Sequence, residues 1–268
     1  MMDKKSYGFL STPPLWTKEQ FGIRQFEFPT IATDTFRLKP IPTNRRLGHQ
    51  MEYVFQQLLE HDPSYAIILH NLPIKNEKRT LGEIDFILRD LKTEKLLHVE
   101  LTYKFYIIDP DISEPIHRLM GPNRRDMFFT KMEKIKNEQF PILHSEEGVA
   151  ALRARDIDVK SIIHQACFKA QLFYPYNAPK TSIRPLNKAC IVGYWLHFDT
   201  INGIPFKQCL FYIPFKTEWP IVPHMAVPWI SHFELLMELQ LRMLKENAPL
   251  IWIKKEDDTI EKCFVVWW

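Results

Sequence analysis

Apolar residues recur at three- and four-residue spacing in several stretches of the chain, which is the pattern of amphipathic helices. The predicted helices are residues 47–60, a segment that opens at Pro122 or Asn123 and stops before Pro141, and residues 229–246. Asn44 is a candidate cap for the first of them, and Pro63 prevents its continuation. The buried face of the second helix is predicted to consist of Phe128, Met132 and Ile135.

Short apolar or alternating runs, separated by polar turns, predict the strands. They are residues 65–71, 81–89, 96–108, 159–174, 189–198, 208–213 and a terminal hairpin of 249–253 with 260–268. Residues 159–174 fit a helix or a strand, and a strand is favoured. A helix followed by three strands in meander order is therefore expected near the start of the chain.

This order of elements indicates an α/β (α+β) protein with a central mixed sheet flanked by helices. Residues 1–45 are rich in proline without a clear period and are expected to form an extended arm. Residues 46–175 are expected to form the core, and residues 176–268 an aromatic-rich α/β extension packed on it.

Composition excludes several classes of protein. The chain has 8 glycines against 20 prolines and contains neither GxGxxG nor a Walker A sequence, so kinase, P-loop and Rossmann functions have no support. Its four cysteines are widely spaced and favour free thiols in a reducing cytoplasm. Without a signal peptide or a run of roughly 20 apolar residues, a cytoplasmic protein without a membrane partner is expected. The formal net charge of +3 does not by itself argue for nucleic acid.

Two carboxylates stand where half-buried strands normally carry apolar residues. Asp85 lies between Ile84 and Phe86, and Glu100 lies between Val99 and Leu101. Because a flanked carboxylate is costly to bury without a cation or donor, this pair on neighbouring strands predicts a site for Mg²⁺ or Mn²⁺.

These residues and their order resemble the PD-(D/E)XK nuclease core. That core has a helix, a three-strand meander, an acid on the second strand, and an acid and a lysine on the third. The resemblance implies catalytic roles for Glu52, Asp85, Glu100 and Lys104, with metal held by Asp85 and Glu100. In the nuclease core the lysine follows its acid by two residues, and in this chain Thr102 occupies that position. Lys104 lies two residues further along the same face of the strand.

The chain also resembles an uncharacterised bacterial family with a nuclease-like core. The matching segments are LGHQMEYVF, LGEIDFILRD, HVELTYKFYI, GPNRRDMFFTKMEKI, FYP, GYW and the closing FVV. They lie between residues 45 and 268. Lys131 and Lys134 are alternatives to the displaced lysine.

Other polar residues admit two interpretations. Arg124, Arg125 and Lys131 either form an ordinary solvated face or position phosphate, since GPNRR is predicted to place its arginines at a helix N-terminus. His98 is expected to share the face of Glu100 only if a bulge intervenes, and is interpreted as structural. Glu83 is expected to be an outer charge partner.

The leading functional hypothesis is a Mg²⁺-dependent nuclease that hydrolyses phosphodiester bonds in nucleic acid, with DNA favoured over RNA. The alternative is a catalytically degenerate module that keeps the fold and binds nucleic acid or a protein partner without cleavage. Thr102 favours this alternative. A homo-oligomer is compatible with either hypothesis.

Overall fold

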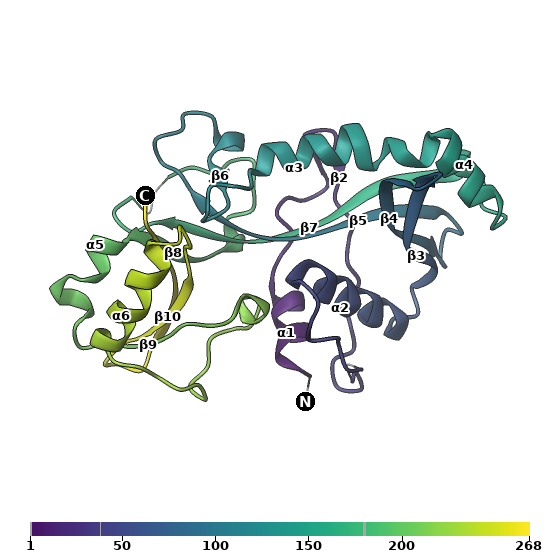
Figure 1. The fold of residues 1–268 in the computed structure, drawn as a ribbon. Coiled ribbons are helices and arrows are strands. Elements are labelled where there is room, and N and C mark those ends of the chain that lie inside the picture. The colour runs from purple at the N-terminus through teal and green to yellow at the C-terminus, as the bar shows by residue number, and fades with distance from the viewer. Residues whose placement is uncertain (1, 38, 179–180) are drawn as a thin grey trace. The chain divides into compact units, whose positions relative to one another are not determined.

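The computed structural model describes residues 2–37, 39–178 and 181–268 (Figure 1). The chain divides into two compact units, each assembled from separate stretches of sequence. Unit 1 comprises Met1–Ser6, Pro14–Tyr103 and Thr130–Lys169, and unit 2 comprises Tyr7–Pro13, Lys104–Phe129 and Ala170–Trp268. The division predicted from the sequence instead consists of three consecutive segments, residues 1–45, 46–175 and 176–268.

Three consecutive strands form the predicted meander. They are β3 (Tyr65–Asn76), β4 (Arg79–Asp90) and β5 (Leu96–Ile108), with β7 (Ile162–Pro175) next to β5. Unit 1 contains β3, β4 and the first parts of β5 and β7. Both consecutive pairings, β3 with β4 and β4 with β5, are antiparallel. The preference for a strand in the ambiguous segment 159–174 is confirmed by β7.

Helix α2 (Leu47–His61) is the helix that was predicted for residues 47–60. Its apolar stripe is buried, and Phe55 packs against Phe86 of β4 with ring centroids 4.7 Å apart. The predicted cap Asn44 is wrong, because the residue that precedes the first turn is Arg46, in extended conformation. Burial of this stripe, rather than a polar cap, therefore stabilises the helix.

The segment before the second predicted helix folds as a turn. Gly121 N–H donates to the Asp126 carbonyl at 2.6 Å, and Arg124 has a φ of 55°. Helix α3 therefore begins at Phe128 and not at Pro122 or Asn123. As predicted, Phe128, Met132 and Ile135 are buried.

Helix α3 (Phe128–Lys134) is the first of a series of short helices. It is followed by a π-helical turn (Ile135–Gln139), a 3₁₀ turn (Pro141–His144) and α4 (Glu146–Arg153). Ser145 caps α4 by accepting from Gly148 N–H at 3.0 Å. Helix α4, which sequence reasoning missed, and α2 lie on opposite sides of the unit 1 strands (Figure 1).

Unit 2 contains the mixed part of the sheet. Its strands are β6 (Leu119–Met120), β8 (Ile191–His197), β9 (Leu210–Tyr212), β10 (Leu250–Lys254) and β11 (Ile260–Val266). Strand β8 is parallel to β7 and β11, whereas β10 pairs with both β11 and β9 in antiparallel fashion. The predicted terminal hairpin is confirmed. Helices α5 (Phe198–Ile201) and α6 (His232–Met243) also belong to this unit.

The N-terminal region contains more regular structure than the extended arm that was predicted. Helix α1 (Lys4–Ser11) is followed by a small hairpin of β1 (Glu19–Gln20) and β2 (Ile23–Arg24). All four cysteines are buried free thiols. Among the helices of the described ranges, none has the length and apolarity needed to cross a bilayer.

Candidate metal site on strands β4 and β5

Asp85 and Glu100 come together where β4 and β5 stop pairing. The antiparallel ladder runs from Arg89 opposite Leu96 to Phe86 opposite Val99. Continuing that register by one step places Asp85 opposite Glu100. The amide of Leu101 then donates to Asp85 Oδ2 at 2.9 Å, so a side chain takes the place of a backbone acceptor. The carboxylates thus lie together at the point where the strands separate.

Glu100 is fully buried, and both of its oxygens are hydrogen-bonded to protein groups. His98 Nε2 lies 2.9 Å from Oε1, and Gln139 Nε2 donates to Oε2. Gln139 belongs to the π-helical turn that follows α3. The packing of that turn against β4 and β5 therefore sets the position of the Glu100 carboxylate.

Burial raises the pKa of both acids. For Glu100 the pKa rises from its ordinary 4.5 to about 7, and the positive charge of Lys131 partly opposes the effect of burial. The pKa of Asp85 is raised well above its usual range, first by burial and then by the negative charge of Glu100. The simultaneous ionisation of these two carboxyl groups is therefore unfavourable, and a divalent cation between them would stabilise the ionised pair.

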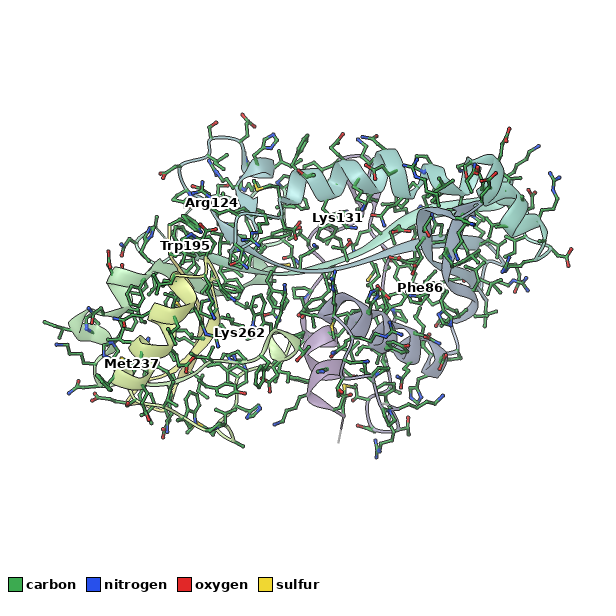
Figure 2. The ribbon with its side chains drawn as sticks, in the orientation of Figure 1. Phe86, Arg124, Lys131, Trp195, Met237 and Lys262 are labelled. Carbon is green, nitrogen blue, oxygen red and sulfur yellow. The ribbon has the colours of Figure 1, made fainter. Side chains whose placement is uncertain are left out.

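Glu52 and Lys131 complete the charged cluster in unit 1. Glu52, on α2, accepts from Asn71 Nδ2 at 2.9 Å, and its charge also raises the pKa of Asp85. Lys131, on α3, donates to Gln139 Oε1 at 2.8 Å, and its charge lowers the pKa of both Asp85 and Glu100 (Figure 2). Glu52 therefore acts electrostatically on Asp85, and Lys131 acts on both acids.

Lys104, the predicted catalytic lysine, has an acidic partner in unit 2. Its Nζ lies 2.6 Å from Asp126 Oδ2. Thr102, in the usual lysine position, is buried in unit 1, and its hydroxyl has no hydrogen-bond partner among the described residues. Within unit 1, the lysine shown to influence both acids is therefore Lys131.

His98 was misjudged from the sequence. Residues two apart on a strand share a face, so His98 and Glu100 contact each other without a bulge. A chain of imidazoles continues outward, with His98 Nδ1 3.0 Å from His164 Nδ1, and His164 Nε2 3.0 Å from the exposed His144. Burial lowers the pKa of His98 to about 3 and that of His164 to about 4, so both rings are neutral near pH 7.

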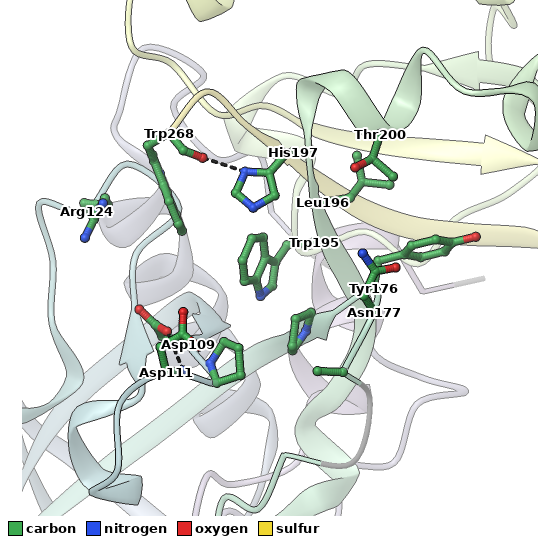
Figure 3. A pocket seen from close by; sticks show the side chains of 13 residues that line it. Asp109, Asp111, Arg124, Tyr176, Asn177, Trp195, Leu196, His197, Thr200 and Trp268 are labelled. Carbon is green, nitrogen blue, oxygen red and sulfur yellow. Dashed lines mark hydrogen bonds between the residues drawn. The ribbon is translucent and has the colours of Figure 1, made fainter.

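The predicted phosphate residues Arg124 and Arg125 lie in the turn before α3, so the premise that they occupy a helix N-terminus is wrong. Arg124 stacks over the ring of Trp268 at 4.6 Å, and Arg125 lies 3.9 Å from Glu246. In Figure 3, Trp195 and His197 lie on the other side of Trp268. A cavity of about 440 Å³ in unit 2 is lined by residues that include Arg124, Trp195, His197 and Trp268. It was not predicted from the sequence.

The donor set near Asp85 consists of two neighbouring carboxylates. Within the described ranges, no group of three or more His, Cys, Asp or Glu side chains is arranged to hold a metal. Asp85 and Glu100 nevertheless fit Mg²⁺, which proteins commonly bind through one or two carboxylates, with water and substrate oxygens filling the other positions.

Comparisons with known proteins place the chain in a family without assigning it an activity. The model of the family described as "Domain of unknown function (DUF1853)" matches residues 28–266. Neither the curated proteins nor the solved structures include a significant match. Because the match extends over most of the chain, the protein belongs to the DUF1853 family.

Proposed function

We propose that unit 1 is a Mg²⁺- or Mn²⁺-dependent phosphodiesterase that acts on nucleic acid, with a PD-(D/E)XK-like site. The observation that carries this proposal is the convergence of Asp85 and Glu100 where β4 and β5 separate. Lys131 influences both acids electrostatically, and Glu52 influences Asp85. DNA is the favoured substrate.

The residues have different tasks in this proposal. Asp85 and Glu100 would hold the ion, which when bound supplies charge stabilisation for the phosphodiester and a lower pKa for an attacking water. Lys131 would stabilise negative charge that develops on the phosphate. Glu52 would orient water near Asp85. His98 and Gln139 hold the Glu100 carboxylate in position through their hydrogen bonds.

A second candidate is a nuclease-like module that binds nucleic acid or a protein without cutting. Two observations favour it. Both oxygens of Glu100 are already hydrogen-bonded to protein groups. Thr102 replaces the usual lysine, and Lys104 is paired with Asp126.

Calorimetric titration with Mn²⁺ and a cleavage assay on single- and double-stranded DNA and RNA distinguish these candidates. We expect Asp85→Asn and Glu100→Gln to lose both metal binding and cleavage. Glu83→Gln is the matched control, since Glu83 is an exposed acid on the same strand as Asp85. Metal binding without cleavage, or nucleic-acid binding without metal, would support the non-catalytic module.

A further inference from the structure

Helix α6 in unit 2 has two apolar faces, of which the fold covers one. Leu235 and Leu239 are fully buried in a core cluster with residues of β9, β10 and β11. The other face carries large apolar side chains that are exposed to solvent (Figure 2 labels Met237). They are Phe233, Met237, Leu241 and Leu244, with exposed fractions of 72%, 53%, 59% and 84%.

These four residues form one continuous stripe. Their spacings of four, four and three residues keep them on the same side of a helix. A contiguous exposed stripe of this kind indicates an interaction surface, whereas isolated exposed apolar residues are ordinary. This stripe is called the α6 stripe below.

Charges of opposite sign lie near the two ends of the α6 stripe, and the exposed Glu238 lies between them along the same edge. Glu234 lies in the first turn and Lys245 just beyond the last turn, and both are exposed. The step of eleven residues from Glu234 to Lys245 spans roughly three helical turns, so both flank the same edge of the stripe. In an antiparallel pair of identical helices the same edges face each other. Glu234 of each copy then lies opposite Lys245 of the other.

We propose that the α6 stripe binds the α6 stripe of a second copy of this chain, in antiparallel orientation. Along the helix, the two-fold axis lies at the level of residues 239 and 240, midway between Glu234 and Lys245. Such an isologous contact buries the exposed apolar residues of both copies and closes at a dimer. It rests on unit 2 alone and does not depend on the proposed nuclease function.

The first test measures the molar mass of the full chain in solution by light scattering and sedimentation over a wide concentration range. We expect a dimer for the wild type, and association weakened on the order of a hundredfold or more by Met237→Glu, because each copy then buries a charge. Glu256→Ala, in the exposed turn between β10 and β11 and away from α6, is the control and should remain dimeric. Circular dichroism checks that each variant keeps its fold.

The second test establishes the orientation with a short bis-maleimide cross-linker, to which the four buried native cysteines are poorly accessible. Gln240→Cys lies at the level of the two-fold axis and should link to its own counterpart. Lys245→Cys should not, because its counterpart lies roughly 16 Å away along the helix axis. In a parallel pair both positions would link.

Several results overturn the proposal. A wild-type chain that stays monomeric at every concentration excludes the second copy as the occupant. A dimer unaffected by Met237→Glu places the contact elsewhere. Cross-linking of both cysteine variants to themselves excludes the antiparallel arrangement.

Discussion

The backbone N–H of Leu101 donates to the Asp85 carboxylate at 2.9 Å, across the gap where β4 and β5 stop pairing. This single bond accounts for two features of the site. The Leu101 N–H lies beyond the β4–β5 ladder, and the bond supplies it with an acceptor. The bond also holds Asp85 beside Glu100. An acid on β4 thus both ends the pairing and forms half of the carboxylate pair.

The carboxylate pair predicts a pH-dependent stability. Because the folded pKa of Glu100 is raised from 4.5 to about 7, the native state binds more protons than the unfolded state between these values. Without divalent metal, the free energy of unfolding should therefore fall as pH rises from about 4.5 to about 7. Glu100→Gln should flatten this decrease and raise the melting temperature at pH 7.5 in a chelator. Chemical denaturation across this pH range measures it, and an unchanged slope in Glu100→Gln would contradict the prediction.

The same pair predicts stabilisation by divalent metal. Mn²⁺ should raise the melting temperature of the wild type above pH 7, where the acids ionise more readily, and by less at pH 5. Asp85→Asn should lose this response, while Glu83→Gln should keep it. Thermal denaturation with and without Mn²⁺ provides the measurement. If Mn²⁺ raised the melting temperatures of the two variants equally, Asp85 would not be a ligand of the metal.

Lys131 and Lys104 should differ in their effect on activity. Lys131 acts electrostatically on Asp85 and Glu100, whereas Lys104 is paired with Asp126. In a chain that cleaves nucleic acid, Lys131→Met should lower kcat by about 10²-fold or more. Lys104→Met should have a smaller effect. The opposite order in single-turnover assays would return the catalytic role to Lys104.

His98 should contribute to stability through the buried Glu100. His98→Leu removes a hydrogen-bonding partner from a fully buried carboxyl group, which should cost about 1–3 kcal/mol. Urea denaturation measures this loss at pH 7. The double variant His98→Leu with Glu100→Gln tests the cause. If coupling through Glu100 is responsible, the two effects will not add.

Lys262 in unit 2 should destabilise the fold at neutral pH. It is buried, with Nζ donating to Gln171 Oε1 at 2.8 Å and to the Trp219 carbonyl at 2.9 Å, and burial lowers its pKa from 10.5 to about 7 (Figure 2). The unfolded state binds more protons between pH 7 and 10.5. The contribution of Lys262 therefore makes the free energy of unfolding rise with pH, by up to about 1.4 kcal/mol per pH unit.

Lys262→Met should remove that rise, which equilibrium denaturation at several pH values measures. Lys254→Met is the matched control, because Lys254 lies on the neighbouring strand and pairs with Asp258. An equal change of slope in both variants would exclude the buried amine as its source.

What the sequence by itself determined are the features that depend on local periodicity. The apolar stripe of α2, the β3–β5 meander and the positions of Asp85 and Glu100 follow from which side chains share a helix stripe or a strand face. The ends of helices were predicted less well from the sequence. Gly121, Pro122 and Asn123 lie in a turn, so α3 begins only at Phe128.

Only the tertiary structure decided which groups meet the two acids. Gln139 reaches Glu100, Lys131 influences both carboxylates, and Lys104 pairs instead with Asp126. These contacts join residues that are far apart in the chain, and none follows from spacing along one element. The exposed α6 stripe has the same origin, since periodicity marks apolar positions on a helix but packing determines which of them the fold covers.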